Sequence, residues 1–122
     1  MSKTLKLTVN KTWFDMYKSG YKKEEYRELK QYWIKRLLSN IDHLTCKKDV
    51  EAVGARFLNF DFVELKNGYS KTSPSLLFEF KGTRIGQDYN DDWGGFLKSD
   101  EEGYKKDCFI ISIGTEVGRL NC

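Results

Sequence analysis

The densest group of residues able to do chemistry lies between Gly20 and Arg27. Lys22, Glu25 and Arg27 supply an ammonium, a carboxylate and a guanidinium within six residues. On a strand, Glu25 and Arg27 would share one face, about 7 Å apart. A carboxylate held between two cations has a fixed orientation, so it could accept hydrogen bonds from a ligand, while the guanidinium would present a planar fork to a carbonyl or phosphate.

If this group of residues is sheltered from water, it could catalyse a reaction as well as bind a ligand. Lys22 follows a glycine turn, so its ammonium could lean over the strand that comes next. In a partly buried position it could act as a general base or a nucleophile, with Glu25 moving protons. The alternative is an exposed edge strand whose charges neutralise one another and add little stability.

The flanking residues predict the elements that position this group. Leu5–Val9 alternate with polar residues, as in a half-buried strand. Asn10 offers an N-cap for a helix over 11–19, and a glycine suits the C-terminal end of that helix. The aromatic residues of this helix are expected in the core. The charged group then lies on a strand over 23–28, and a second helix over 31–39 follows, with Trp33 expected to serve in packing.

The second half of the chain predicts mainly strands. Residues 58–64 alternate, Asn67-Gly68 is a hairpin signal, and a partner strand is expected over 76–85. Residues 109–113 close the chain as a buried strand, after which Gly114 is expected to start a turn. The order of elements predicts a small α+β domain on a mixed or antiparallel sheet, curled into a barrel.

Two segments outside the charged group could also contact a ligand. Asn67 and Tyr69 could hydrogen-bond and stack a base, or they could simply form the hairpin turn. Residues 87–107 are rich in acidic residues and are predicted to form a long loop. Within it, Trp93 beside two glycines could form a flap that stacks on a base, or it could anchor the loop to the core.

Composition limits the class of protein. The 122 residues suit one domain over 1–122, and no apolar run is long enough for a membrane span or a secretion signal. Three scattered cysteines and one histidine signal neither a metal site nor a disulfide framework, so thiols in the cytoplasm and no metal or cofactor are expected. Residues 1–56 carry a net charge of +6 and residues 57–122 carry −3. The basic half could attract a phosphate backbone, or these charges could simply be solvated.

The spacing G-x-K-x-x-E-x-R resembles the motif of ASCH domains, which belong to the PUA-like group of small barrels. Other segments resemble a compact ASCH subgroup of bacteria and phages, namely Leu5–Val9, Trp13–Asp15, Tyr26–Glu28, Tyr32–Trp33, Phe60–Val63, Asn67–Tyr69, Phe78–Gly82 and Ile111–Gly114. The resemblance implies a PUA-like β-barrel of five or six mostly antiparallel strands, with two main helices packed beside it and a cleft lined by the motif.

The resemblance also implies binding of RNA or of a modified nucleoside. A base would enter the cleft, stack on Tyr69 or Trp93, and be read by Glu25 and Arg27. Basic residues would hold phosphates, namely Lys22, Lys23, Lys30, Lys35 and Arg36. An interaction domain with no nucleic-acid role is a further reading that the net charge of +3 allows.

Catalysis is the alternative, because some small bacterial ASCH proteins hydrolyse the amide of N4-acetylcytidine. In that type a lysine at the place of Lys22 acts with a threonine at the place of Glu25, so this chain departs from the pattern at the second position. Here Lys22 and Glu25 would form the catalytic pair, and Glu79 is the candidate for a third acid, because strand alternation could turn it inward.

Overall fold

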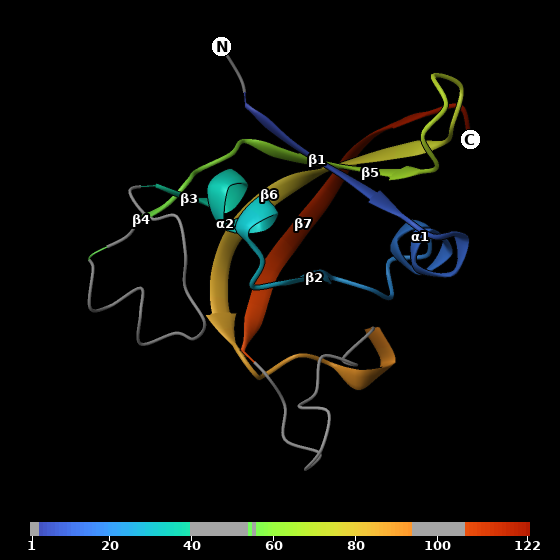
Figure 1. Ribbon diagram of the computed structural model, residues 1–122. Coiled ribbons are helices and arrows are strands. Elements are labelled where there is room, and N and C mark those ends of the chain that lie inside the picture. Colours follow the sequence, from blue (N-terminus) through green and yellow to red (C-terminus); the bar gives the residue numbers. More distant parts are fainter. Residues whose placement is uncertain (1–2, 40–53, 55, 94–106) are drawn as a thin grey trace. The chain divides into compact units, whose positions relative to one another are not determined.

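The computed structural model describes residues 3–39, 54, 56–93 and 107–122 (Figure 1). It is an α+β structure with two α-helices and a five-stranded mixed sheet. The elements are β1 (Thr4–Val9), α1 (Lys11–Lys18), β2 (Glu24–Glu28), α2 (Gln31–Leu37), β3 (Leu38–Ser39), β4 (Arg56–Phe57), β5 (Phe62–Asn67), β6 (Ser75–Gly86), the short 3-10 helix η1 (Asp91–Trp93) and β7 (Cys108–Leu120). None of the helices in the described ranges has the length and apolarity to cross a bilayer.

The sheet is open, which corrects the expectation of a β-barrel. Its strand order is β1-β5-β6-β7-β2, so β1 and β2 are the edges, and the described residues contain no ladder that joins them. β1 runs parallel to β5 with Thr4 opposite Phe62, while β5 and β6 are antiparallel with Val63 opposite Phe78 (Figure 1). A closed barrel requires its two edges to pair. The chain leaves β1 through a helix, and no hairpin connects β1 to β2.

The chain divides into two compact units, each described here by itself. The first unit comprises Met1–Glu24, Asn59–Gly82 and Ser112–Cys122, and the second comprises Glu25–Leu58 and Thr83–Ile111. Buried residues of the first unit include Leu5, Leu7, Val9, Phe14, Tyr17, Val63, Leu65 and Leu76. The second unit has a cluster of Tyr26, Tyr89, Cys108 and Ile110, against which Trp93 packs.

Helix α1 begins at Lys11, as its sequence predicts, and ends at Lys18, one residue before the predicted end at residue 19. The side chain of Asn10 accepts a hydrogen bond from the backbone N–H of Trp13 at 3.0 Å, which satisfies one donor of the first turn. After Ser19, Gly20 adopts a φ of +83°, a conformation that few side chains tolerate. The Gly20 N–H donates to the Tyr17 carbonyl. The chain therefore turns sharply out of α1 toward β2.

The second helix is shorter than expected. The prediction of a helix over 31–39 is wrong for its last two residues, because α2 ends at Leu37 and Leu38–Ser39 form β3. Leu38 takes an extended conformation and pairs with Phe57 in the two-residue ladder of β3 and β4. The Leu58 N–H then donates to the Leu37 carbonyl at 2.9 Å. Strand pairing thus replaces the last two residues of the predicted helix.

Strand β5 is shifted relative to the prediction of 58–64. It begins at Phe62, and its fully buried residues are Val63 and Leu65. Asp61 is the last residue before β5. Its carboxylate accepts a hydrogen bond from the Lys3 N–H at 2.8 Å. Residues 68–74 join β5 to β6, so the connection is longer than the two-residue turn that Asn67-Gly68 suggested.

Strand β7 continues past the expected turn at Gly114 and runs to Leu120. The partner strand predicted over 76–85 is confirmed as β6. Gly114 serves close packing, because a Cβ built there would lie 2.6 Å from Lys81 Cε and 3.2 Å from Glu79 Cβ. The glycine therefore lets two side chains of β6 cross over β7.

This packing predicts different effects at two glycines of β7. Gly114→Ala should lower the free energy of unfolding by about 1–3 kcal/mol, because Lys81 and Glu79 must move. Gly118→Ala is the matched control, since its nearest neighbour would be Leu77 Cβ at 3.8 Å, an ordinary contact. Urea unfolding of both variants would measure the difference, and equal stabilities would contradict the packing described.

Candidate functional site

The charged residues of the motif are sheltered from water. Lys22 and Glu25 are each only 3% exposed, and the Arg27 side chain is 17% exposed. Among the described residues, Ser75 is the other buried polar residue. The sequence left open the alternative that these charges are exposed and neutralise one another. Lys22, Glu25 and Arg27 do not fit that alternative, although β2 is an edge strand and its Glu28 is exposed.

In the first unit, Lys22 lies against aromatic rings of α1. Its Nζ is 4.2 Å from the centroid of the Trp13 ring and 5.0 Å from that of Tyr17. The backbone N–H groups of Tyr21 and Lys22 both donate to the Met16 carbonyl, at 3.0 and 3.1 Å. The turn is thus tied to the C-terminal end of α1, which directs the lysine onto these rings. An ammonium on aromatic faces is a favourable cation–π arrangement.

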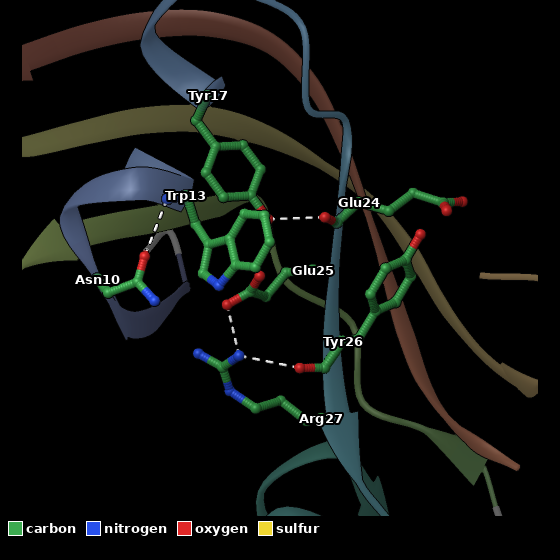
Figure 2. A network of polar contacts seen from close by, with 7 residues as sticks. All are labelled: Asn10, Trp13, Tyr17, Glu24, Glu25, Tyr26 and Arg27. Atoms are coloured by element: carbon green, nitrogen blue, oxygen red, sulfur yellow. Dashed lines mark hydrogen bonds and ion pairs between the residues drawn. The ribbon is translucent and has the colours of Figure 1, made fainter. Parts of the chain in front are cut away.

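Tyr17 connects α1 to the start of β2. Its hydroxyl donates to the Glu24 carbonyl at 2.7 Å, as Figure 2 shows. Its ring is buried and packs on Phe78, with 6.1 Å between the ring centroids. Trp13 and Tyr17 are four residues apart and so share one side of the helix. Both were expected to be core residues. Tyr17 is buried, Trp13 is only partly buried, and both contact the lysine of the motif.

In the second unit, Glu25 and Arg27 form an ion pair along β2. Arg27 Nη1 donates to Glu25 Oε2 and also to the Tyr26 carbonyl, at 2.9 Å in the latter case (Figure 2). This confirms that the two side chains share a face. The intervening Tyr26 ring belongs to the buried cluster, and its hydroxyl accepts from the Asn90 N–H at 2.8 Å.

Arg27 also contacts the aromatic residues of α2. Its Cζ lies 5.0 Å from the centroid of the Trp33 ring. The Arg36 Cζ lies 5.0 Å from the same ring and 5.3 Å from that of Tyr32. Tyr32 meets Trp33 edge to face at 4.9 Å and accepts from Arg36 Nη1 at 3.0 Å. The sequence assigned Trp33 to packing alone. The three-dimensional contacts add two guanidinium partners.

The basic residues expected to hold phosphates differ in exposure. Lys23, Lys30 and Lys35 are exposed, Arg36 is partly buried, and Lys22 is buried on its rings. The Lys30 ammonium lies 3.5 Å from the carboxylate of Glu28, with both side chains largely in solvent. The three exposed lysines therefore differ from Lys22, whose ammonium lies on the Trp13 and Tyr17 rings.

The remaining candidate residues lie on several elements. Asn67 ends β5, and its N–H donates to the Pro74 carbonyl, while Tyr69 in the loop 68–74 is largely exposed. Glu79 on β6 is partly exposed and pairs with Lys81 at 3.0 Å. Trp93 packs against the buried cluster, as the anchoring alternative for this residue expected. The glycines beside Trp93 lie outside the described residues, so the proposed flap remains a prediction.

The structure brings Glu25 and Arg27 together, and it brings Lys22 to Trp13 and Tyr17. Asn67, Tyr69 and Glu79 belong to the first unit, and Trp93 belongs to the second. Within the described ranges, no three His, Cys, Asp or Glu residues are grouped as metal ligands would be. Comparison of this chain with protein-family models, with curated proteins and with solved structures finds no match.

Two ion pairs with the same spacing allow a direct test of the buried pair. Glu25–Arg27 and Glu79–Lys81 each join residues two apart on a strand, but only the first is sheltered. A double-mutant cycle with Glu25→Gln and Arg27→Met should give a coupling energy of about 1–3 kcal/mol. The matched cycle with Glu79→Gln and Lys81→Met should give less than about 1 kcal/mol. Equal coupling energies in urea unfolding would contradict the contrast in burial.

Proposed function

We propose that this protein binds RNA or a modified nucleoside, and that Glu25 and Arg27 read the base. The observation that supports this most directly is the burial of a complete carboxylate–guanidinium pair on an edge strand. The proposal includes the resemblance to ASCH domains of the PUA-like group, in which Lys22 belongs to the same motif. It invokes no metal or cofactor.

The energetic cost of the pair is the reason to assign it a function. Removing two charges from water costs several kcal/mol, and their attraction offsets that cost only with good geometry and further hydrogen bonds. Replacement of such a pair by apolar residues is often neutral or stabilising. A fold that needed only a packed edge strand would gain little stability from charges there, so their presence favours recognition of a ligand.

The chemistry of the pair suits a nucleobase. A carboxylate accepts hydrogen bonds from ring N–H and exocyclic amino groups, and a guanidinium donates to carbonyl oxygens or phosphates. The ring of Trp33 beside Arg27 adds an aromatic surface of the kind on which bases stack. We further propose a cytoplasmic location, where RNA ligands occur and a thiol such as the exposed Cys122 persists.

Hydrolysis of an acylated nucleoside is the second candidate, and the burial of Lys22 is the observation that favours it. A lysine held against Trp13 and Tyr17 is shielded from bulk water, and desolvation is one way in which enzymes activate a lysine. In this version the neutral amine form of Lys22 takes a proton from the attacking water, Glu25 moves a proton to the leaving nitrogen and Arg27 polarises the acyl oxygen. The amide bond to the base breaks, and water supplies the hydroxyl of the released acid and the proton of the amine.

Binding should be strongly dependent on salt and on the geometry of Arg27. We expect a fluorescein-labelled single-stranded RNA to bind with an affinity that falls linearly in a plot of log affinity against log salt. Arg27→Lys keeps the charge but loses the planar fork, so binding should weaken roughly tenfold or more. Lys11→Ala, which removes an exposed ion pair, is the control and should bind as wild type. Anisotropy titrations in which low and moderate salt give the same affinity would contradict the proposal.

The catalytic candidate predicts acetate release from N4-acetylcytidine. Lys22→Ala should abolish that release, while Lys23→Ala, which changes the exposed neighbouring lysine, should retain most of it. Enzymatic detection of acetate together with chromatography of the cytidine product would measure turnover. An absence of turnover across a panel of acylated nucleosides, by a folded protein that binds them, would leave binding as the function.

A further inference from the structure

Tyr32 on α2 presents an aromatic ring to solvent in a fixed position. The residue is 62% exposed, although it belongs to a helix whose Ile34 and Leu37 are buried. Its ring stands edge to face on Trp33, with 87° between the ring planes, and its hydroxyl accepts from Arg36. An exposed tyrosine usually samples several rotamers. These contacts hold this one in place before any ligand arrives, which lowers the entropy cost of binding to it.

The fixed ring is connected to the buried ion pair of β2. Arg27 joins Glu25 on one side and lies 5.0 Å from the Trp33 ring on the other, and Trp33 in turn supports Tyr32. All of these residues belong to the second unit. A continuous series of contacts therefore runs from the proposed base-reading pair to an exposed ring on the surface.

The surface around this ring is basic. Between Glu25 and Leu37 the sequence has four cations and two carboxylates. Lys30 and Lys35 flank Tyr32 in the sequence and are exposed, while Arg36 contacts the ring directly. Aromatic rings among cations are the composition with which proteins bind single-stranded nucleic acid, where bases stack and phosphates meet the charges.

We infer that α2 is a stacking surface for single-stranded RNA, on which the base next to the one read by Glu25 and Arg27 lies against Tyr32. This inference rests on the proposed function and extends it from one nucleoside to a strand. Lys30 and Lys35 contact the phosphates on either side. A base in a duplex is already stacked on its neighbours and cannot cover the ring, so duplex RNA binds more weakly than the single strand.

Titration of labelled RNA against Tyr32 variants tests the inference. The probes are a fluorescein-labelled adenosine 12-mer, the same strand annealed to its complement, and unlabelled nucleosides. Tyr32→Ala should weaken binding of the single strand roughly 5- to 100-fold, while Tyr32→Phe, which keeps the ring, should stay within about twofold of wild type. Neither variant should change nucleoside binding, because the ring holds the neighbouring base. Circular dichroism confirms that each variant is folded.

Salt dependence supplies a second measurement that does not depend on the ring. Lys35→Gln should reduce the slope of log affinity against log salt by about 0.7, as expected for the loss of one phosphate contact to a single strand. Lys71→Gln, in the exposed loop 68–74, should leave that slope unchanged.

The outcomes separate this inference from the proposed function. If the wild-type protein binds RNA and Tyr32→Ala binds it equally well, the stacking surface is overturned and the proposed function is retained. Equal affinities for the duplex and the single strand also overturn it. A wild-type protein that binds neither RNA nor nucleosides overturns both. Weaker single-strand binding by Tyr32→Ala, with nucleoside binding unchanged, supports both.

Discussion

The buried carboxylate of Glu25 is the constraint on which the second unit's candidate site depends. A carboxylate removed from water needs a close cation, and Arg27 supplies one from the same strand face. The guanidinium is itself fixed by the Tyr26 carbonyl and the Trp33 ring. A slip of β2 by one residue would turn Glu25 and Arg27 to the opposite face and Tyr26 out of its cluster. The pair therefore specifies the register of the strand as well as the position of its own charges.

The first unit solves the corresponding problem for a buried ammonium in a different way. Lys22 lies on the rings of Trp13 and Tyr17, so its charge is met by aromatic faces. Desolvation strengthens such contacts, which makes them more valuable here than on a surface. An eight-residue helix is marginal by itself. The packing of Tyr17 on Phe78 and its bond to Glu24 thus support both α1 and the position of the lysine.

Local signals in the sequence were sufficient for some elements and insufficient for others. The cap at Asn10 and the turn at Gly20 depend on neighbouring residues, so α1 could be predicted. The start of β5 could not, because apolar residues before Phe62 alternate just as those within the strand do. Gly114 has the appearance of a turn residue, and only the side chains that cross it from β6 explain why the strand continues. The open sheet likewise depends on which strands pair over long range. The expected barrel required the two edge strands to pair, and within the described residues β1 and β2 do not.

The candidate site shows the same division. The two-residue spacing of Glu25 and Arg27 was enough to place them on one face. The aromatic partners of Lys22 and Arg27 come from helices before and after the motif, and amphipathic spacing alone gives such rings a core role.

The parallel pairing of β1 with β5, in which Thr4 lies opposite Phe62, has a consequence for folding. Because β1 precedes β5 in the chain, it is synthesised earlier and must wait for this partner, and charged residues such as Lys6 between its apolar ones reduce self-association during that delay.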